Sequence, residues 1–169
     1  TKLNLIKGLN HAGCNVITTN TFGANSLKFD NVDKIIESAV SLAKKSTDNY
    51  DRDTFVALDV GPIGKLLEPC GDLPFEEAYN LFKEQVIAGE KSGADLVLIE
   101  TMGDLYEIKA AVLAAKENTK LPVLVSMIFD TNGKLLTGAD IKTAVITLEG
   151  LGVDGIGMNC GLGPDQMLH

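Results

Sequence analysis

The chain has 169 residues, of which 45% are apolar and 22% charged, and its formal net charge is −8 at pH 7. This is enough apolar material for one well-packed core. The acidic balance argues against a nucleic-acid-binding surface, which needs clustered Lys and Arg. No apolar run approaches the length of about 18 residues that a membrane helix requires, so no membrane span is predicted.

Short apolar segments alternate with amphipathic ones along the chain. The spacing of apolar residues predicts, in order, a helix over 3–12, a strand over 15–22, a helix over 31–45, a strand over 54–60, a helix over 74–92, a strand over 95–101, a helix over 104–117, a strand over 122–129, a helix over 140–151 and a strand over 153–160. Pro74 suits the first turn of its helix. Asp104 with Glu107 three residues later matches a capping box.

The predicted strands are short and almost continuously apolar, which is typical of parallel strands buried on both faces. Because helices alternate with them, every connection is expected to be a crossover. A doubly wound open sheet and a (β/α)8 barrel both fit this order. No glycine-rich nucleotide signature follows the first strand, whereas polar residues end several different strands, as they do at the rim of a barrel: Asn20, Asp59, Glu100, Ser126 and the Asn159-Cys160 pair.

The barrel is therefore the favoured architecture, although it would be partial. A complete barrel has eight strands and about 250 residues, and five strands are predicted here. The fold class is α/β, a partial (β/α)8 TIM barrel with about five parallel strands and alternating helices.

Five segments of the chain match one known family in order and spacing. They are residues 19–24, 59–62, 94–101, 134–138 and 157–164. On these segments the chain resembles the homocysteine S-methyltransferases, and most closely the N-terminal homocysteine-binding barrel of cobalamin-dependent methionine synthases. The family's first strand carries an Asp-Gly pair and a late strand carries a Gly-Gly-Cys-Cys-Gly motif, and neither has a counterpart here. The resemblance implies that residues 1–169 are one incomplete barrel domain with family strands two to six.

Cys160 is the candidate metal ligand. Taken alone, a cysteine that ends an apolar strand is more often part of the core. Zinc prefers thiolates, and catalytic zinc sites combine three protein ligands with one open position. The resemblance implies that Cys160 is one ligand and that the absent cysteine pair supplies the others, so the site is incomplete in this chain. The homocysteine sulfur would take the open position as a thiolate. Cys14 and Cys70 are expected to be structural.

The resemblance also implies that Glu100 binds the amino group of homocysteine. Spacing alone instead favours Glu100 as a solvated rim carboxylate or as the partner of a helix cap. The remaining strand-end residues can either contact the substrate or brace the rim, and a serine in a buried strand can simply bond the backbone. The predicted substrate-binding residues are Glu100, Asn20, Thr21, Asp59, Ser126 and Asn159.

The resemblance therefore implies part of a zinc-dependent homocysteine S-methyltransferase that activates homocysteine as a zinc thiolate, with methionine as the product. Cobalamin and folate would bind to separate modules of the parent enzyme, which are the expected partners together with homocysteine. Three widely spaced cysteines do not make a disulfide framework, and they indicate the reducing cytoplasm. A second interpretation is a catalytically inactive barrel fragment that folds and self-associates through its open strand edges.

Overall fold

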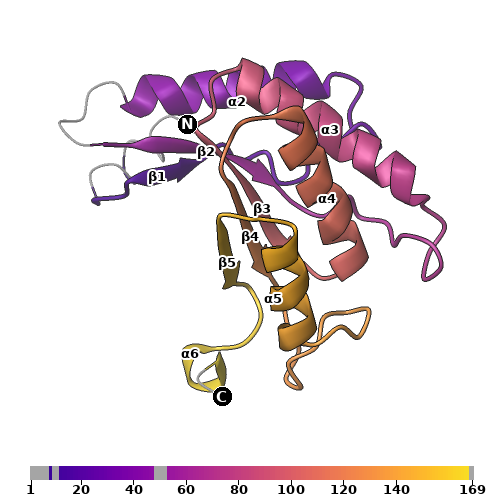
Figure 1. Cartoon of the computed structure of the whole chain (residues 1–169). Helices are drawn as coiled ribbons and strands as arrows, with labels where there is room; N and C mark the ends of the chain where they lie inside the picture. The colour runs from indigo at the N-terminus through magenta and orange to yellow at the C-terminus, as the bar shows by residue number, and fades with distance from the viewer. Residues whose placement is uncertain (1–7, 9–11, 48–52, 168–169) are drawn as a thin grey trace.

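The computed structural model describes residues 8, 12–47 and 53–167. Within these ranges, parallel strands form one five-stranded sheet in the order β1-β2-β3-β4-β5 (Figure 1): β1 (Val16–Thr18), β2 (Phe55–Val60), β3 (Leu96–Met102), β4 (Val123–Met127) and β5 (Gly155–Met158). The helices are α2 (Val32–Thr47), α3 (Phe75–Lys91), α4 (Leu105–Asn118), α5 (Ile141–Gly150) and the single turn α6 (Pro164–Met167). The predicted alternation of strands and helices is confirmed. The helix expected over 3–12 lies almost entirely outside the described residues.

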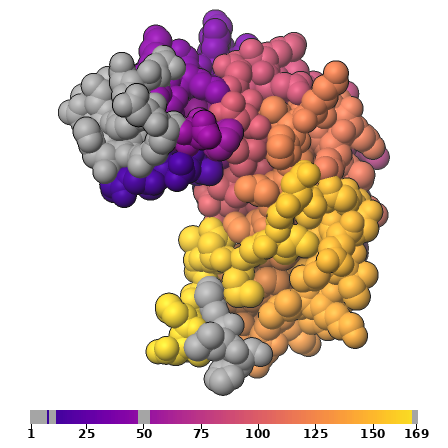
Figure 2. Space-filling view, turned by 60° about the vertical axis from the view of Figure 1, so that its left-hand side comes forward, coloured from indigo at the N-terminus to yellow at the C-terminus, as the bar shows by residue number. Residues whose placement is uncertain are grey.

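The two faces of the sheet have different environments. Figure 1 shows helices α2 to α5 on one side of a curved sheet, where side chains such as Leu58 and Ile99 are fully buried. Helix α3 approaches closely because it carries Gly89, where an added Cβ would lie 2.5 Å from a methyl group of Leu58. The opposite face is concave, and Figure 2 shows the surface hollowed between the N-terminal and C-terminal parts of the chain. This hollow corresponds to the interior of a barrel.

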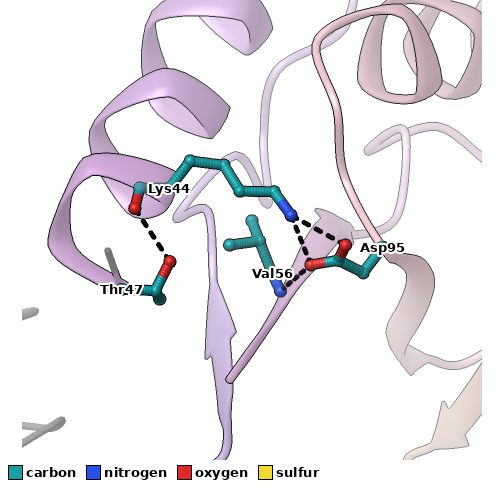
Figure 3. Close-up of polar contacts among 4 residues, drawn as sticks. All are labelled: Lys44, Thr47, Val56 and Asp95. Atoms are coloured by element: carbon teal, nitrogen blue, oxygen red, sulfur yellow. Dashed lines mark hydrogen bonds and ion pairs between the residues drawn. The ribbon is translucent and has the colours of Figure 1, made fainter. Parts of the chain in front are cut away.

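An ion pair ties the amino end of β3 to the preceding strand and helix (Figure 3). Asp95 accepts a hydrogen bond from the Val56 backbone N–H at 2.6 Å, and both of its carboxylate oxygens lie 2.7 Å from Lys44 Nζ. The same arrangement recurs two strands later, where Asp154 accepts from the Val123 N–H at 2.8 Å and from Lys116 Nζ at 3.2 Å. Two of the β/α units are therefore fastened in the same way, at the edge opposite to the predicted site.

Replacing Asp95 by alanine is expected to lower the free energy of unfolding by about 1–2 kcal/mol, because the half-buried Val56 N–H loses its acceptor. Urea denaturation measures the change. The matched control is Asp72→Ala, which removes an exposed pair with Lys65 whose N–O distance is 3.9 Å; such pairs contribute little. Equal losses in the two variants would contradict a specific role for Asp95.

Candidate functional site

The predicted strand-end residues collect on the concave side of the sheet, at its carboxyl edge. Leu58 contacts the position of Gly89 on α3, and the register pairs Leu58 with Val97 of β3, so both of these side chains face the helices. Since side chains alternate between faces along a strand, the neighbouring positions face the hollow. Following the register across the sheet places four predicted residues there: Asp59, Glu100, Ser126 and Asn159.

Asn159 is the centre of a polar network that joins β3, β4 and β5. Its Oδ1 accepts a hydrogen bond from Ser126 Oγ at 3.1 Å, and its Nδ2 donates to Thr101 Oγ1 at 2.9 Å. The same Nδ2 lies 3.5 Å from Glu100 Oε2. The Thr101 hydroxyl in turn points to Cys160 Sγ at 3.8 Å. Four of the residues named from the sequence therefore meet in one network, with the carboxylate and the thiol on either side of Asn159 and Thr101.

Thr101 was not among the predicted site residues, although it follows Glu100 directly. Among the described residues, three that are not glycine have a positive φ: Asn20 at 57°, Thr101 at 60° and Cys160 at 57°. All three lie where β1, β3 and β5 end, and this conformation is uncommon for any residue other than glycine, above all for a β-branched one. Strained backbone of this kind clusters at functional sites, so its position supports a ligand site at this edge.

A second group of contacts joins β2 to the segment that follows β1. The Asp59 N–H donates to Thr19 Oγ1 at 3.0 Å, and Thr21 Oγ1 donates to the Asp59 carbonyl at 2.7 Å. The two threonine oxygens are 2.7 Å apart, and because the Thr21 hydrogen is already used, Thr19 is the donor between them. Thr21 is buried and Asn20 is exposed. The Thr21 hydroxyl thus braces the rim, which was one of its two predicted roles.

The Asp59 side chain carries the most unusual electrostatics of this edge. It is 5% exposed, and its Oδ1 is a buried atom for which the described part of the chain provides no hydrogen-bond partner. Burial raises the pKa of Asp59 to about 7, with a further contribution from the hydrogen-bonding and charge of the neighbouring Glu100 carboxyl. The backbone N–H groups of Phe22 and Thr21 act in the opposite direction. Two carboxyl groups from adjacent strands therefore lie together here.

A cavity of about 660 Å³ lies beside this network and shares Thr101 with it. Its walls come from the loops after β2, β3 and β4, and they include Glu107 of α4. Glu107 does not complete the predicted capping box. Asp104 caps α4 by accepting from the Tyr106 N–H at 3.0 Å, whereas Glu107 Oε1 accepts from the Ile63 N–H at 2.8 Å. Burial raises the pKa of Glu107 to about 7.

Among the described residues, one thiol, that of Cys160, contacts the Asn159-centred network. Cys160 is exposed at the end of β5, Cys70 is in the loop between β2 and α3, and Cys14 precedes β1 at the opposite edge. No group of three His, Cys, Asp or Glu side chains within the described ranges is arranged to hold a metal ion. These residues therefore offer one ligand of the kind that zinc prefers and do not complete a zinc site by themselves.

Parallel strands, crossover helices and a polar network at the carboxyl edge together define a partial (β/α)8 barrel, the fold in which ligand sites lie at this edge. The family model for homocysteine S-methyltransferases matches residues 7–169. The chain belongs to the homocysteine S-methyltransferase family. No helix among the described residues has the length and apolar character to cross a bilayer.

Relatives and solved structures agree with this assignment. The chain is 34% identical over 170 residues to the methionine synthase of Mycobacterium leprae and 31% identical to that of Mycobacterium tuberculosis. In each comparison the aligned segment covers 92% of this chain and 14% of the length of the relative. The homocysteine methyltransferase MmuM from Escherichia coli matches in its metallated form with a TM-score of 0.84 and 21% identity, over 97% of this chain and 64% of that one. The apo form of the same enzyme matches with a TM-score of 0.82 and 23% identity. At these identities the structural matches show the fold alone.

Proposed function

We propose that this chain is part of a zinc-dependent homocysteine S-methyltransferase of the methionine synthase type. The observation that carries the proposal is the Asn159-centred network, which holds the Glu100 carboxylate and the Cys160 thiol at one edge of the hollow. Homocysteine carries an ammonium group and a thiol on one short chain. A carboxylate that accepts the ammonium and a thiol that contributes to a metal site suit these two ends.

In this proposal each residue of the network has a defined task. Glu100 accepts the substrate ammonium, and Asn159, held by Ser126 at 3.1 Å, orients the Glu100 carboxylate. Thr101 directs its hydroxyl to Cys160 and so orients the sulfur. Asn20, exposed at the end of β1, is available to the substrate. Bound zinc would lower the pKa of the homocysteine thiol and present it as a thiolate.

The proposal includes protein outside this chain. Cys160 would be one zinc ligand, and the others would come from the remaining strands of the barrel, of which residues 1–169 would be an incomplete domain. The methyl group would be carried by cobalamin on a separate module, with folate on another, as the family resemblance implies. The 14% share of the methionine synthase relatives leaves room for such modules. The unpaired cysteines suit the cytoplasm.

The test uses two variants in the full-length protein that contains this chain. Glu100→Gln is expected to weaken homocysteine binding about tenfold, or about 1.4 kcal/mol, because the ammonium loses a charged acceptor. Its zinc content should not change. Cys160→Ser is expected to lower zinc content and methyl transfer. Calorimetry measures the affinity and metal analysis measures the zinc, with thermal unfolding as the control for folding. Full zinc content and full activity in Cys160→Ser would overturn the proposal.

A second candidate is an inactive fragment that self-associates. Val16 and Phe55 are each 47% exposed and belong to paired positions of β1 and β2 on the concave face. Exposed apolar side chains on an open sheet favour pairing with another copy. Analytical ultracentrifugation of the 169-residue chain distinguishes the candidates, since a monomer at micromolar concentration argues against self-association.

A further inference from the structure

The Asp59 carboxyl has surroundings that the proposed function does not explain. Its Oδ1 is buried, and no donor within the described residues reaches it. Glu100 lies on the same face of the adjacent strand β3, two residues after Leu98, with which Asp59 is paired, and its carboxylate is also an acceptor. A buried acceptor without a donor is costly, and two ionised carboxylates side by side on adjacent strands repel each other. One proton held between the two groups removes both problems, since the neutral carboxyl becomes a donor to its neighbour.

The position of Asp59 is fixed by its backbone. The ring of hydrogen bonds through Thr19 and Thr21 engages both the N–H and the carbonyl of Asp59, so the carboxyl cannot turn away from Glu100 by a shift of the strand. The groups that face the carboxyl are the backbone N–H groups of Thr21 and Phe22 from the segment after β1 and Glu100 from β3. Within the described residues, no lysine, arginine or histidine forms an ion pair with Asp59.

A pair of carboxyl groups without a cation is suited to receive one. We propose that Asp59 and Glu100 share one proton in the free site and release it when the α-ammonium group of the substrate binds, so that the pair, rather than Glu100 alone, selects amino-acid thiols over thiols that lack an amino group. This inference rests on the proposed function of Glu100. The proton passes from the Asp59 carboxyl to solvent as the ammonium arrives, and the charge of the site changes from −1 to −2 while one positive charge is added.

The proposal predicts a pH dependence with a definite sign. At pH values below about 7, where the pKa of Asp59 lies, binding of the ammonium must expel the proton, so the affinity rises with pH. Above that value the proton is already lost and the affinity levels off. A ligand without an ammonium group gains nothing from the second negative charge. The difference between two such ligands therefore isolates the contribution of the carboxyl pair.

The experiment compares L-homocysteine with 4-mercaptobutyrate, which keeps the thiol and the carboxylate and lacks the amino group. Calorimetry of the full-length protein in buffers of different ionisation enthalpy gives the number of protons released when each ligand binds. Any proton lost from the thiol group is common to both ligands and cancels in the comparison. Homocysteine is expected to release about one proton more than 4-mercaptobutyrate at pH 6, and the ratio of their affinities is expected to rise about twentyfold from pH 5.5 to 7.5.

In Asp59→Asn, which keeps the backbone contacts and the size of the side chain, both differences should disappear. A merely structural role for Asp59 would change the affinity without removing the extra proton. Equal proton release by the two ligands in the wild-type protein would overturn the inference. This measurement does not depend on the folding of any variant. The proposed function fails separately, if homocysteine does not bind or if Glu100→Gln binds it unchanged.

Discussion

Replacement of Gly61 by alanine is expected to lower the free energy of unfolding by about 3 kcal/mol. Gly61 follows β2 directly, and a Cβ at this position would lie 2.5 Å from a ring carbon of Phe22 and 2.6 Å from the Phe22 carbonyl oxygen. The exposed ring can swing aside, but the carbonyl accepts a hydrogen bond from the Gly61 N–H at 3.1 Å and cannot move without losing it. Overpacking costs about 1–3 kcal/mol, and a lost backbone hydrogen bond adds about 1 kcal/mol.

The matched control is Gly150→Ala at the end of α5, where an added Cβ would meet no atom within 4 Å. Because alanine is the better helix former, this variant should gain up to about 1 kcal/mol. Urea denaturation compares both variants with the wild-type protein. The Phe22–Gly61 contact also holds the segment of Thr21 against β2, so Gly61→Ala should also weaken the homocysteine binding that we propose. Equal stability of the two glycine variants would contradict the crowding at Gly61.

The order of elements could be predicted because apolar periodicity is a local property. The helix expected over 104–117 is α4, Leu105–Asn118, and the other described elements follow the predicted order. The first strand was predicted too long, over 15–22, whereas β1 ends at Thr18. The chain leaves the sheet there because Asn20 has a φ of 57° and because Thr19 and Thr21 bond across to β2. No apolar pattern reports these contacts.

The site could be predicted in part for a similar reason. Parallel strands end at one edge, so polar residues at several strand ends are expected to meet, and Glu100, Ser126, Asn159 and Cys160 do. Thr101 was missed because its place between Asn159 and Cys160 depends on a left-handed backbone. The role of Glu107 was wrong because the capping pattern is local, while its real partner, Ile63, is 44 residues away.

Glu107→Gln is expected to stabilise the protein by about 2 kcal/mol at pH 8 and to change little at pH 5. Burial raises the pKa of Glu107 from 4.5 to about 7, with Asp104 adding to the rise, while the Ile63 N–H and Lys28 oppose it. Between these two values the folded protein keeps a proton that the unfolded chain has lost, so the free energy of unfolding falls as pH rises from 4.5 to 7. The full effect has an upper limit of about 3 kcal/mol. Glutamine carries no charge and still offers an oxygen to the Ile63 N–H.

Asp59 titrates in the same window with the same sign, because its pKa is also raised to about 7. Glu107→Gln should therefore remove one part of the fall in the free energy of unfolding with rising pH. Asp59→Asn should remove the other part. The two residues have different hydrogen-bond partners, so their effects should add. Urea denaturation between pH 5 and 8 should give a nearly flat profile for the double variant. The exposed Glu149→Gln serves as the control and should keep the wild-type slope. A wild-type slope in Glu107→Gln would mean that Glu107 is already ionised at pH 5.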